Sequence, residues 1–218
     1  MRTIHAIEQE SYAILRGQLA LSHPEAEAWP PLARAVLERV VHASADLDYA
    51  AELTVPDEDV LAEAVAALAE GVPVVVDVNM VAAGITRRET RCRITDPRAA
   101  ALAAETGITR SAAALRLAAE AAGPGALYVI GCAPTALFEL VDRAEEYRPL
   151  LVVGLPVGFV GAVESKQALR EAAAAANGPL RGRAISNRSG KGGSAVAAAA
   201  FNALLYLDSP KLPEGTNQ

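Results

Sequence analysis

Three histidines could exchange protons near neutral pH, namely His5, His23 and His42. His42 closes the helical run ARAVLERVVHAS, and the carboxyl end of a helix carries the negative end of the helix dipole. That dipole, together with Asp46 four residues further on, favours the cationic form of the imidazole. His42 is therefore the candidate proton donor, with a purely structural helix-terminal role as the alternative. His5 and His23 are predicted to be surface residues.

Arginines gather in three stretches of a chain whose net charge is −6. Guanidinium groups bind carboxylates through paired hydrogen bonds, so a site assembled from several of them would suit a ligand with multiple acid groups. For most of these arginines taken singly, a solvated surface position is the alternative. They are Arg87, Arg88, Arg91 and Arg93, then Arg110, and then Arg181, Arg183 and Arg188.

Four glycine-rich segments follow predicted strands and lead into predicted helices. Glycine permits close backbone approach, and a helix amino terminus offers free N–H groups with partial positive charge, so such segments can bind anions. Ordinary turn chemistry is the alternative at each of them, but four such segments with Thr, Ser, Arg and Lys predict at least one ligand site. The segments are NMVAAGITRR, GCAPTAL, GLPVGFVGAVESK and RGRAISNRSGKGGS.

The run SGKGGS, from Ser189 to Ser194, invites comparison with a nucleotide-binding P-loop. That motif requires Gly, four spacers, Gly-Lys and then Ser or Thr. Ile185 stands where the first Gly is required, and Gly192 stands where the magnesium-binding hydroxyl should be. A nucleoside triphosphate site is therefore not expected, whereas carboxylate capture by the same backbone stays open.

Alternating β and α elements are expected to position these segments. From residue 51 onward, short apolar runs alternate with Ala-rich helical stretches, which is typical of βαβ units in a parallel sheet. We predict an α/β fold with one three-layer domain over 1–208, a helical N-terminal segment and a loose tail at 209–218. Ligands of such sheets bind beyond the carboxyl ends of the strands. Strands are predicted at 72–78, 127–130 and 150–153, with weaker patterns at 52–55, 91–95 and 184–186, and helices at 7–21, 25–42, 57–70, 97–105, 111–122, 134–146, 165–176 and 194–207.

The composition excludes several classes of protein. Of the 218 residues, 52% are hydrophobic and 21% are charged, which excludes intrinsic disorder, and the apolar runs are too interrupted to cross a membrane. The acidic net charge and the scarcity of aromatic residues argue against nucleic acid as a partner. Cys92 and Cys132, without a CxxC pair, indicate neither a disulfide framework nor a zinc site, so no metal is expected. With no secretory signal visible, a cytoplasmic protein is predicted.

Seven motifs follow one another between roughly residues 7 and 205, and the most distinctive is PVGFVGAVESK. In order they are ESYAILR, RVVHA, DVNMVAAGITRR, TRSAAA, GCAPTAL, PVGFVGAVESK and KGGSAVAAAAFNALL. Together they resemble the precorrin-8X methylmutase (precorrin isomerase) family of cobalamin biosynthesis. The resemblance implies a flavodoxin-like fold, a homodimer with shared active sites, and a cofactor-free shift of a methyl group on ring C of a tetrapyrrole. The product would be hydrogenobyrinate from precorrin-8X, or cobyrinate from the cobalt-containing analogue.

The resemblance also implies roles for individual residues. His42 in RVVHA corresponds to the family's proton donor near ring C. Ser11 of ESYAILR and Arg39 of RVVHA fall on positions that bind substrate. Further substrate contacts are implied within the other motifs at Met80, Thr86, Arg87, Thr109, Arg110, Ser111, Thr135, Ser165, Lys166, Gly192, Gly193 and Ser194.

The chain departs from the family pattern at two places near the predicted site. Cys132 stands where the family usually has Asn in GNAPTAL. The RGR and GGS parts of a common motif are separated here by AISNRSGK. It is therefore open which of Arg181, Arg183 and Arg188 takes the role of the family's arginine.

Two other classes of function fit parts of the pattern. A noncatalytic carrier of tetrapyrroles would keep the pocket without the reaction, although His42 beside Arg39 argues against it. Such a carrier would bind the product without converting fresh substrate. A flavodoxin-like electron carrier would need a flavin and a phosphate-binding loop, which the sequence does not provide.

Overall fold

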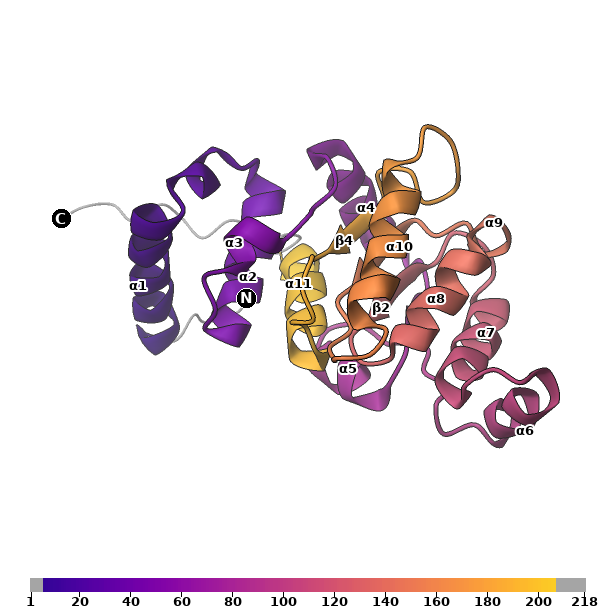
Figure 1. Cartoon of the computed structure of the whole chain (residues 1–218). Coiled ribbons are helices and arrows are strands. Elements are labelled where there is room, and N and C mark those ends of the chain that lie inside the picture. The colour runs from indigo at the N-terminus through magenta and orange to yellow at the C-terminus, as the bar shows by residue number, and fades with distance from the viewer. Residues whose placement is uncertain (1–5, 207–218) are drawn as a thin grey trace.

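A four-stranded parallel sheet forms the centre of the structure, a computed structural model that describes residues 6–206 (Figure 1). Every strand residue is buried, which explains why the strand sequences are apolar except for Ser186 at the end of β4. The strands lie in the order β1-β2-β3-β4. They are β1 (Val74–Val76), β2 (Leu127–Ile130), β3 (Leu151–Gly154) and β4 (Ala184–Ser186).

Single bridges extend the sheet at both edges. Arg91 pairs in parallel with Val75 on the free side of β1, and Thr54 pairs antiparallel with Ser186 of β4. After β1 the chain therefore passes first to one side, at Arg91, and then to the other side, at β2. This reversal places a topological switch point between the carboxyl ends of β1 and β2, where α/β proteins bind ligands.

Helices cover both faces of the sheet, as the three-layer prediction requires. Val74, Val76 and Leu127 face one layer, whereas Val75 and Tyr128 face the other. The first layer contains α1 (Ala6–Ser22), the 3-10 helix η1 (Pro24–Ala28), α2 (Pro31–Ser44), α3 (Tyr49–Glu52), α4 (Glu58–Glu70), α5 (Asn79–Gly84) and α11 (Ser194–Tyr206). The second contains α7 (Arg110–Ala122), α8 (Pro134–Asp142), α9 (Ala144–Tyr147) and α10 (Ala162–Ala174), with α6 (Pro97–Thr106) packed on α7.

Helix α1 lies at the outer end of the molecule, beyond α2 (Figure 1). Leu15 and Leu19 bury one side of it in the core. Ile7, Ile14 and Leu21, each seven residues apart and therefore on one helix face, are 71%, 55% and 88% exposed. An apolar stripe on α1 is thus exposed in the part of the chain that the structure describes.

The α/β fold class is confirmed, and the differences from the predicted elements have local causes. The helix predicted at 25–42 begins only at Pro31, because a residue that precedes proline disfavours helical backbone. The helix predicted at 134–146 is divided at Arg143. The strands predicted at 52–55 and 91–95 are wrong beyond their single bridges, and α3 and α5 are unpredicted short helices. The predicted tail at 209–218 lies outside the described residues.

No helix within residues 6–206 is both long enough and apolar enough to span a membrane. The same residues contain no group of three or more His, Cys, Asp or Glu side chains placed to hold a metal ion.

Candidate active site

His42 lies in the last turn of α2, as the sequence predicts, and its half-buried imidazole stacks on Tyr12 of α1. The ring centroids are 4.7 Å apart and the planes differ by 9°. Asp46 does not act as the expected charge partner of His42. Its carboxylate instead forms an ion pair with Lys191, whose Nζ lies 2.8 Å from Asp46 Oδ2 and 2.7 Å from Asp48 Oδ2.

Arg39, one turn before His42, is held by α1 and α11. Its Nη1 donates to Tyr12 Oη at 3.2 Å and to Glu8 Oε1 at 3.4 Å. The same guanidinium lies over the ring of Tyr206, 4.8 Å from the centroid. The sequence motif RVVHA thus places the Arg39 and His42 side chains against one tyrosine, Tyr12.

Thr86 and Arg87 join this group from the segment after α5. The Arg87 guanidinium lies 4.7 Å from the centroid of the Tyr206 ring, and the Thr86 and Tyr206 hydroxyls are 2.7 Å apart. The structure therefore brings Arg39, Thr86 and Arg87 together around Tyr206, with His42 and Tyr12 adjoining. Ser11 precedes Tyr12 in α1 and is half-buried.

Neither tyrosine was predicted from the sequence. Tyr12 lies within the motif ESYAILR and was detectable there as an aromatic residue beside the predicted substrate contact Ser11. Tyr206 ends α11 and carries no comparable signal, because its importance comes from the packing of α11 against Arg39 and Arg87.

A second group of candidates lies at the amino termini of α7 and α8. Thr109 Oγ1 caps α7 by accepting from the Ala112 N–H at 3.2 Å, and it donates to Thr135 Oγ1 at 2.7 Å. Arg110 is exposed beside this pair, and Ser111 is half-buried. Two helix amino termini thus meet on the carboxyl side of β2, next to Arg110, and helix amino termini can bind a carboxylate.

Asp77, directly after β1, holds the turn that follows β2. Its buried carboxylate accepts the backbone N–H groups of Gly131, Cys132 and Ala133 at 3.1, 2.8 and 2.8 Å. Burial raises the pKa of Asp77, and the three N–H donors oppose that rise. The carboxylate therefore fixes the switch point between β1 and β2. Its sequence signal was a lone acidic residue in a continuously apolar run.

We expect Asp77→Asn to destabilise the fold by about 2–3 kcal/mol, because the amide offers one acceptor oxygen and turns an N–H toward the remaining donors. Urea unfolding of the variant and of the wild type measures the difference. Asp59→Asn, at an exposed position in the first turn of α4, serves as the control and should change the free energy of unfolding by less than about 0.5 kcal/mol. Equal stability of wild type and Asp77→Asn would contradict a structural role for this carboxylate.

Lys166 and Ser165, both predicted to contact substrate, are fully buried in α10. Lys166 Nζ donates to Asn187 Oδ1 at 2.8 Å, to the Lys191 carbonyl at 2.7 Å and to the Ser189 carbonyl. Burial, with a smaller contribution from Arg170, lowers the pKa of Lys166 to about 8. Ser165 Oγ donates to the Ala162 carbonyl at 3.2 Å. These side chains face the protein interior.

The loop held by Lys166 ends in the predicted residues Gly192, Gly193 and Ser194. Gly192 has a φ of +150°, and a Cβ there would collide with the Leu155 carbonyl oxygen, so the position requires glycine. The Gly193 N–H donates to the same Leu155 carbonyl at 2.9 Å. The loops after β3 and β4 therefore lie against each other at the carboxyl edge of the sheet.

The remaining candidates divide between the two edges of the sheet. Met80, in α5, is 72% exposed, and Arg188 is exposed in the loop after β4. Arg183 precedes β4 at the opposite, amino edge, where it binds Glu63 Oε2 and the Leu150 carbonyl, each at 2.9 Å. Arg181 lies in the same turn before β4. Among these three arginines, Arg188 alone lies on the side of the candidate site.

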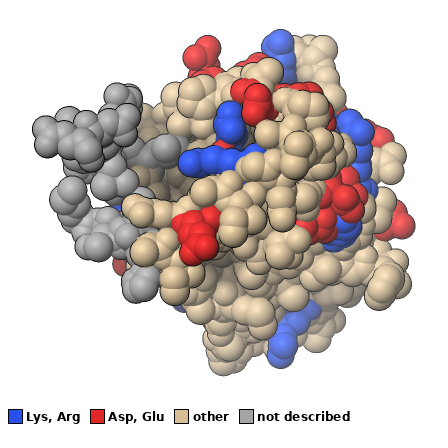
Figure 2. Space-filling view, turned by 90° about the vertical axis from the view of Figure 1, so that its left-hand side faces the viewer, with Lys and Arg blue, Asp and Glu red and all other residues tan. Residues whose placement is uncertain are grey.

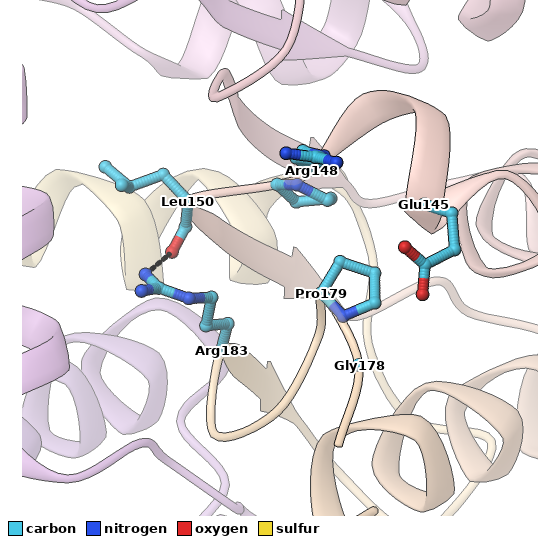
Figure 3. A pocket seen from close by; sticks show the side chains of 7 residues that line it. Glu145, Arg148, Leu150, Gly178, Pro179 and Arg183 are labelled. Atoms are coloured by element: carbon cyan, nitrogen blue, oxygen red, sulfur yellow. Dashed lines mark hydrogen bonds between the residues drawn. The ribbon is translucent and has the colours of Figure 1, made fainter.

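A cavity of about 480 Å³ also lies at the amino edge (Figure 3). None of the predicted substrate contacts lines it, and the Arg183 guanidinium donates to the Leu150 carbonyl at its wall. It is therefore separate from the carboxyl-edge site. Its lining consists of Glu145, Arg148, Pro149, Leu150, Gly178, Pro179 and Arg183.

A parallel α/β sheet with polar loops at its carboxyl edge defines a class of proteins that bind small ligands there. Within that class, the family model described as precorrin-8X methylmutase matches residues 6–207 of the chain. This chain belongs to the precorrin-8X methylmutase family. The family, and the isomerase class that it implies, are those predicted from the sequence motifs.

Individual relatives agree with this family. The chain is 44% identical to the cobalt-precorrin-8 methylmutase of Methanocaldococcus jannaschii, over 78% of this chain and 77% of the relative. It is 42% identical to the precorrin-8X methylmutase of Sinorhizobium sp, over 94% and 95%. The crystal structure of precorrin-8X methyl mutase from Thermus thermophilus superposes with a TM-score of 0.77 at 34% identity, covering 93% of this chain and 95% of that one.

Proposed function

We propose that this chain converts precorrin-8X to hydrogenobyrinate, or its cobalt-containing analogue to cobyrinate, by moving one methyl group between adjacent carbons of pyrrole ring C. The family match over residues 6–207 supports this most strongly. One relative is named cobalt-precorrin-8 methylmutase and another precorrin-8X methylmutase, so both substrates should be tested.

His42 supplies the proton in this proposal. The methyl group migrates within the conjugated substrate, so the enzyme must hold one tautomer and protonate it suitably. The imidazolium of His42 protonates or hydrogen-bonds the nitrogen of ring C, and that proton leaves again as the product forms. An isomerisation therefore consumes no net proton. The position of His42 beside Tyr12 and Arg39 supports this role.

Cationic and N–H-rich groups bind the substrate's carboxylates in this proposal. Binding energy gained at these peripheral groups orients ring C toward His42. Ser165 and Lys166 contribute from inside the protein, by shaping the loop after β4. The proposed contacts are Ser11, Arg39, Met80, Thr86, Arg87, Thr109, Arg110, Ser111, Thr135, Gly192, Gly193 and Ser194.

Two copies of the chain form the working enzyme in this proposal, each completing the other's site. The exposed stripe of Ile7, Ile14 and Leu21 on α1 supports such an assembly. Figure 2 looks onto this side of the molecule, and a large part of the face carries neither acidic nor basic side chains. Phe159 and Val160, in the loop after β3, are also fully or almost fully exposed.

Ile14→Glu is expected to convert the dimer into monomers at micromolar concentration, because a carboxylate in an apolar interface loses its hydration. Sedimentation velocity measures the change in mass, and kcat per chain should fall with it. Gln9→Glu, at an exposed polar position on a different face of the same helix, is the matched control and should remain dimeric. A wild-type chain that sediments as a monomer would refute the proposed assembly.

The activity itself is tested with purified protein and both precorrin-8 substrates, followed by the colour change of the corrinoid. We expect isomerisation of at least one substrate without any added cofactor. Tight product binding without conversion of either substrate would instead identify a carrier.

A further inference from the structure

Tyr12 contacts the two side chains on which the proposed chemistry most depends. Its ring stacks on the imidazole of His42, with centroids 4.7 Å apart and planes 9° from parallel. Its hydroxyl accepts a hydrogen bond from Arg39 Nη1 at 3.2 Å. Tyr12 is half-buried in α1, whereas His42 and Arg39 both belong to α2. One phenol from a neighbouring helix thus joins the imidazole and the guanidinium.

A stack of this kind restricts how the imidazole can turn. The backbone of α2 fixes the Cα–Cβ bond of His42, and rotation about the next bond would drive the imidazole edge into the Tyr12 ring. The stack therefore acts on the orientation of the group that delivers the proton.

The charged neighbours of Tyr12 leave its phenol neutral near neutral pH. Burial raises the pKa of Tyr12, and the nearby Arg39 opposes that rise without cancelling it. Glu8 and Glu38 act in the same direction as burial. The Arg16 guanidinium lies 5.6 Å from the ring centroid. The phenol therefore keeps its proton and presents an uncharged ring to His42.

We propose that Tyr12 is a positioning residue for the isomerisation, whose ring sets the plane of the His42 imidazole. The inference rests on the proposed proton-donor role of His42.

Other contacts hold α1 against α2, so Tyr12 can be changed without releasing the helix. Arg16 of α1 forms a two-pronged ion pair with Glu38 of α2, with Nη2–Oε2 at 2.8 Å and Nε–Oε1 at 3.0 Å. Leu15 and Leu19 are buried in the same interface. The effect of a Tyr12 variant on the imidazole can therefore be measured in a folded protein.

Nuclear magnetic resonance of histidine-labelled protein tests the stack without requiring turnover. The chain has three histidines, and loss of one signal in His42→Ala assigns His42. A ring stacked on the imidazole displaces its carbon-bound proton signals upfield. Tyr12→Phe should keep that displacement, and Tyr12→Leu should abolish it. Unshifted His42 signals in the wild type would overturn the proposed stack.

Kinetics of the same two variants test the consequence for catalysis. We expect Tyr12→Leu to lower kcat about 10–100-fold with KM changed only a few-fold, because misplacement of a catalytic group weakens the transition state more than substrate binding. Tyr12→Phe should stay within about 3-fold of the wild-type kcat.

The outcomes separate this inference from the proposed function. A wild-type kcat in Tyr12→Leu, combined with an inactive His42→Ala, would overturn the positioning role alone. Equal losses in Tyr12→Phe and Tyr12→Leu would show that the hydroxyl, not the ring, matters and would likewise contradict it. Full activity in His42→Ala would instead overturn the proton-donor role while leaving the stack measurable.

Discussion

His42→Ala should lower kcat by about 10²–10⁴-fold, the range over which a positioned general acid accelerates a reaction. Affinity for the product should fall only several-fold, because Arg39, Arg87 and the helix amino termini that bind its carboxylates stay in place. Turnover is followed by the colour change of the corrinoid, and affinity by titration of the variant with hydrogenobyrinate.

The matched control for this variant is His23→Ala. His23 precedes η1 and pairs with Glu25, with Nδ1–Oε1 at 3.3 Å, outside the group around Tyr12 and Tyr206. Its replacement should leave kcat unchanged. Full activity of His42→Ala would eliminate the proton-donor role, and a parallel loss in both variants would point to a general effect on folding.

The position of His42 was predictable because it depends on local sequence. The run ARAVLERVVHAS has a helical pattern that ends beside the histidine, and α2 indeed ends at Ser44. Strand β2 was equally predictable, because a strand buried on both faces is continuously apolar. Strand β4 ends in the polar Ser186 and gave only a weaker pattern. Such features need only a few consecutive residues to be recognised.

The partner of His42 was not predictable, because it depends on how the helices pack. Asp46 seemed suited by its spacing of four residues, but α2 has already ended and Ala45 adopts a left-handed conformation with φ of 53°. The chain therefore turns Asp46 toward Lys191. Tyr12, which does contact His42, is 30 positions earlier in the sequence and reaches it only because α1 packs on α2.

The burial of Lys166 was also not predictable from the sequence. A lysine near the start of a helix is usually exposed, and nothing in the run ESKQALR indicates otherwise. Its burial follows from the loop of residues 187–191, which folds over it and supplies carbonyl acceptors. That arrangement shows that Lys166 holds the loop, while the substrate contact predicted for it stays a prediction.

Lys166→Met should raise KM about 10-fold or more, because the loop that ends in Gly192–Ser194 loses the donor for three of its acceptors. The global effect on stability should be smaller than that on KM, since removing the ammonium also removes the free-energy cost of burying it. Gln167→Met, at the exposed neighbouring position, is the control and should leave KM unchanged. Hydrogen exchange of residues 187–193 measures the loosening directly. A variant with wild-type KM and wild-type exchange in this loop would contradict the role.

Titration of Lys166 should affect substrate binding and protein stability in opposite directions. In the wild type, KM should rise as the pH passes through about 8, because the folded-state pKa lies there and the neutral amine has one N–H fewer to offer the loop. Stability should move the other way. The pKa is lowered on folding from 10.5 to about 8, so between these values the unfolded chain binds more protons and the free energy of unfolding increases with pH. Alkaline denaturation would weaken substrate binding and lower stability together, so it cannot produce this combination. Both trends should disappear in Lys166→Met. Persistence of the KM rise in that variant would assign the titration to another group.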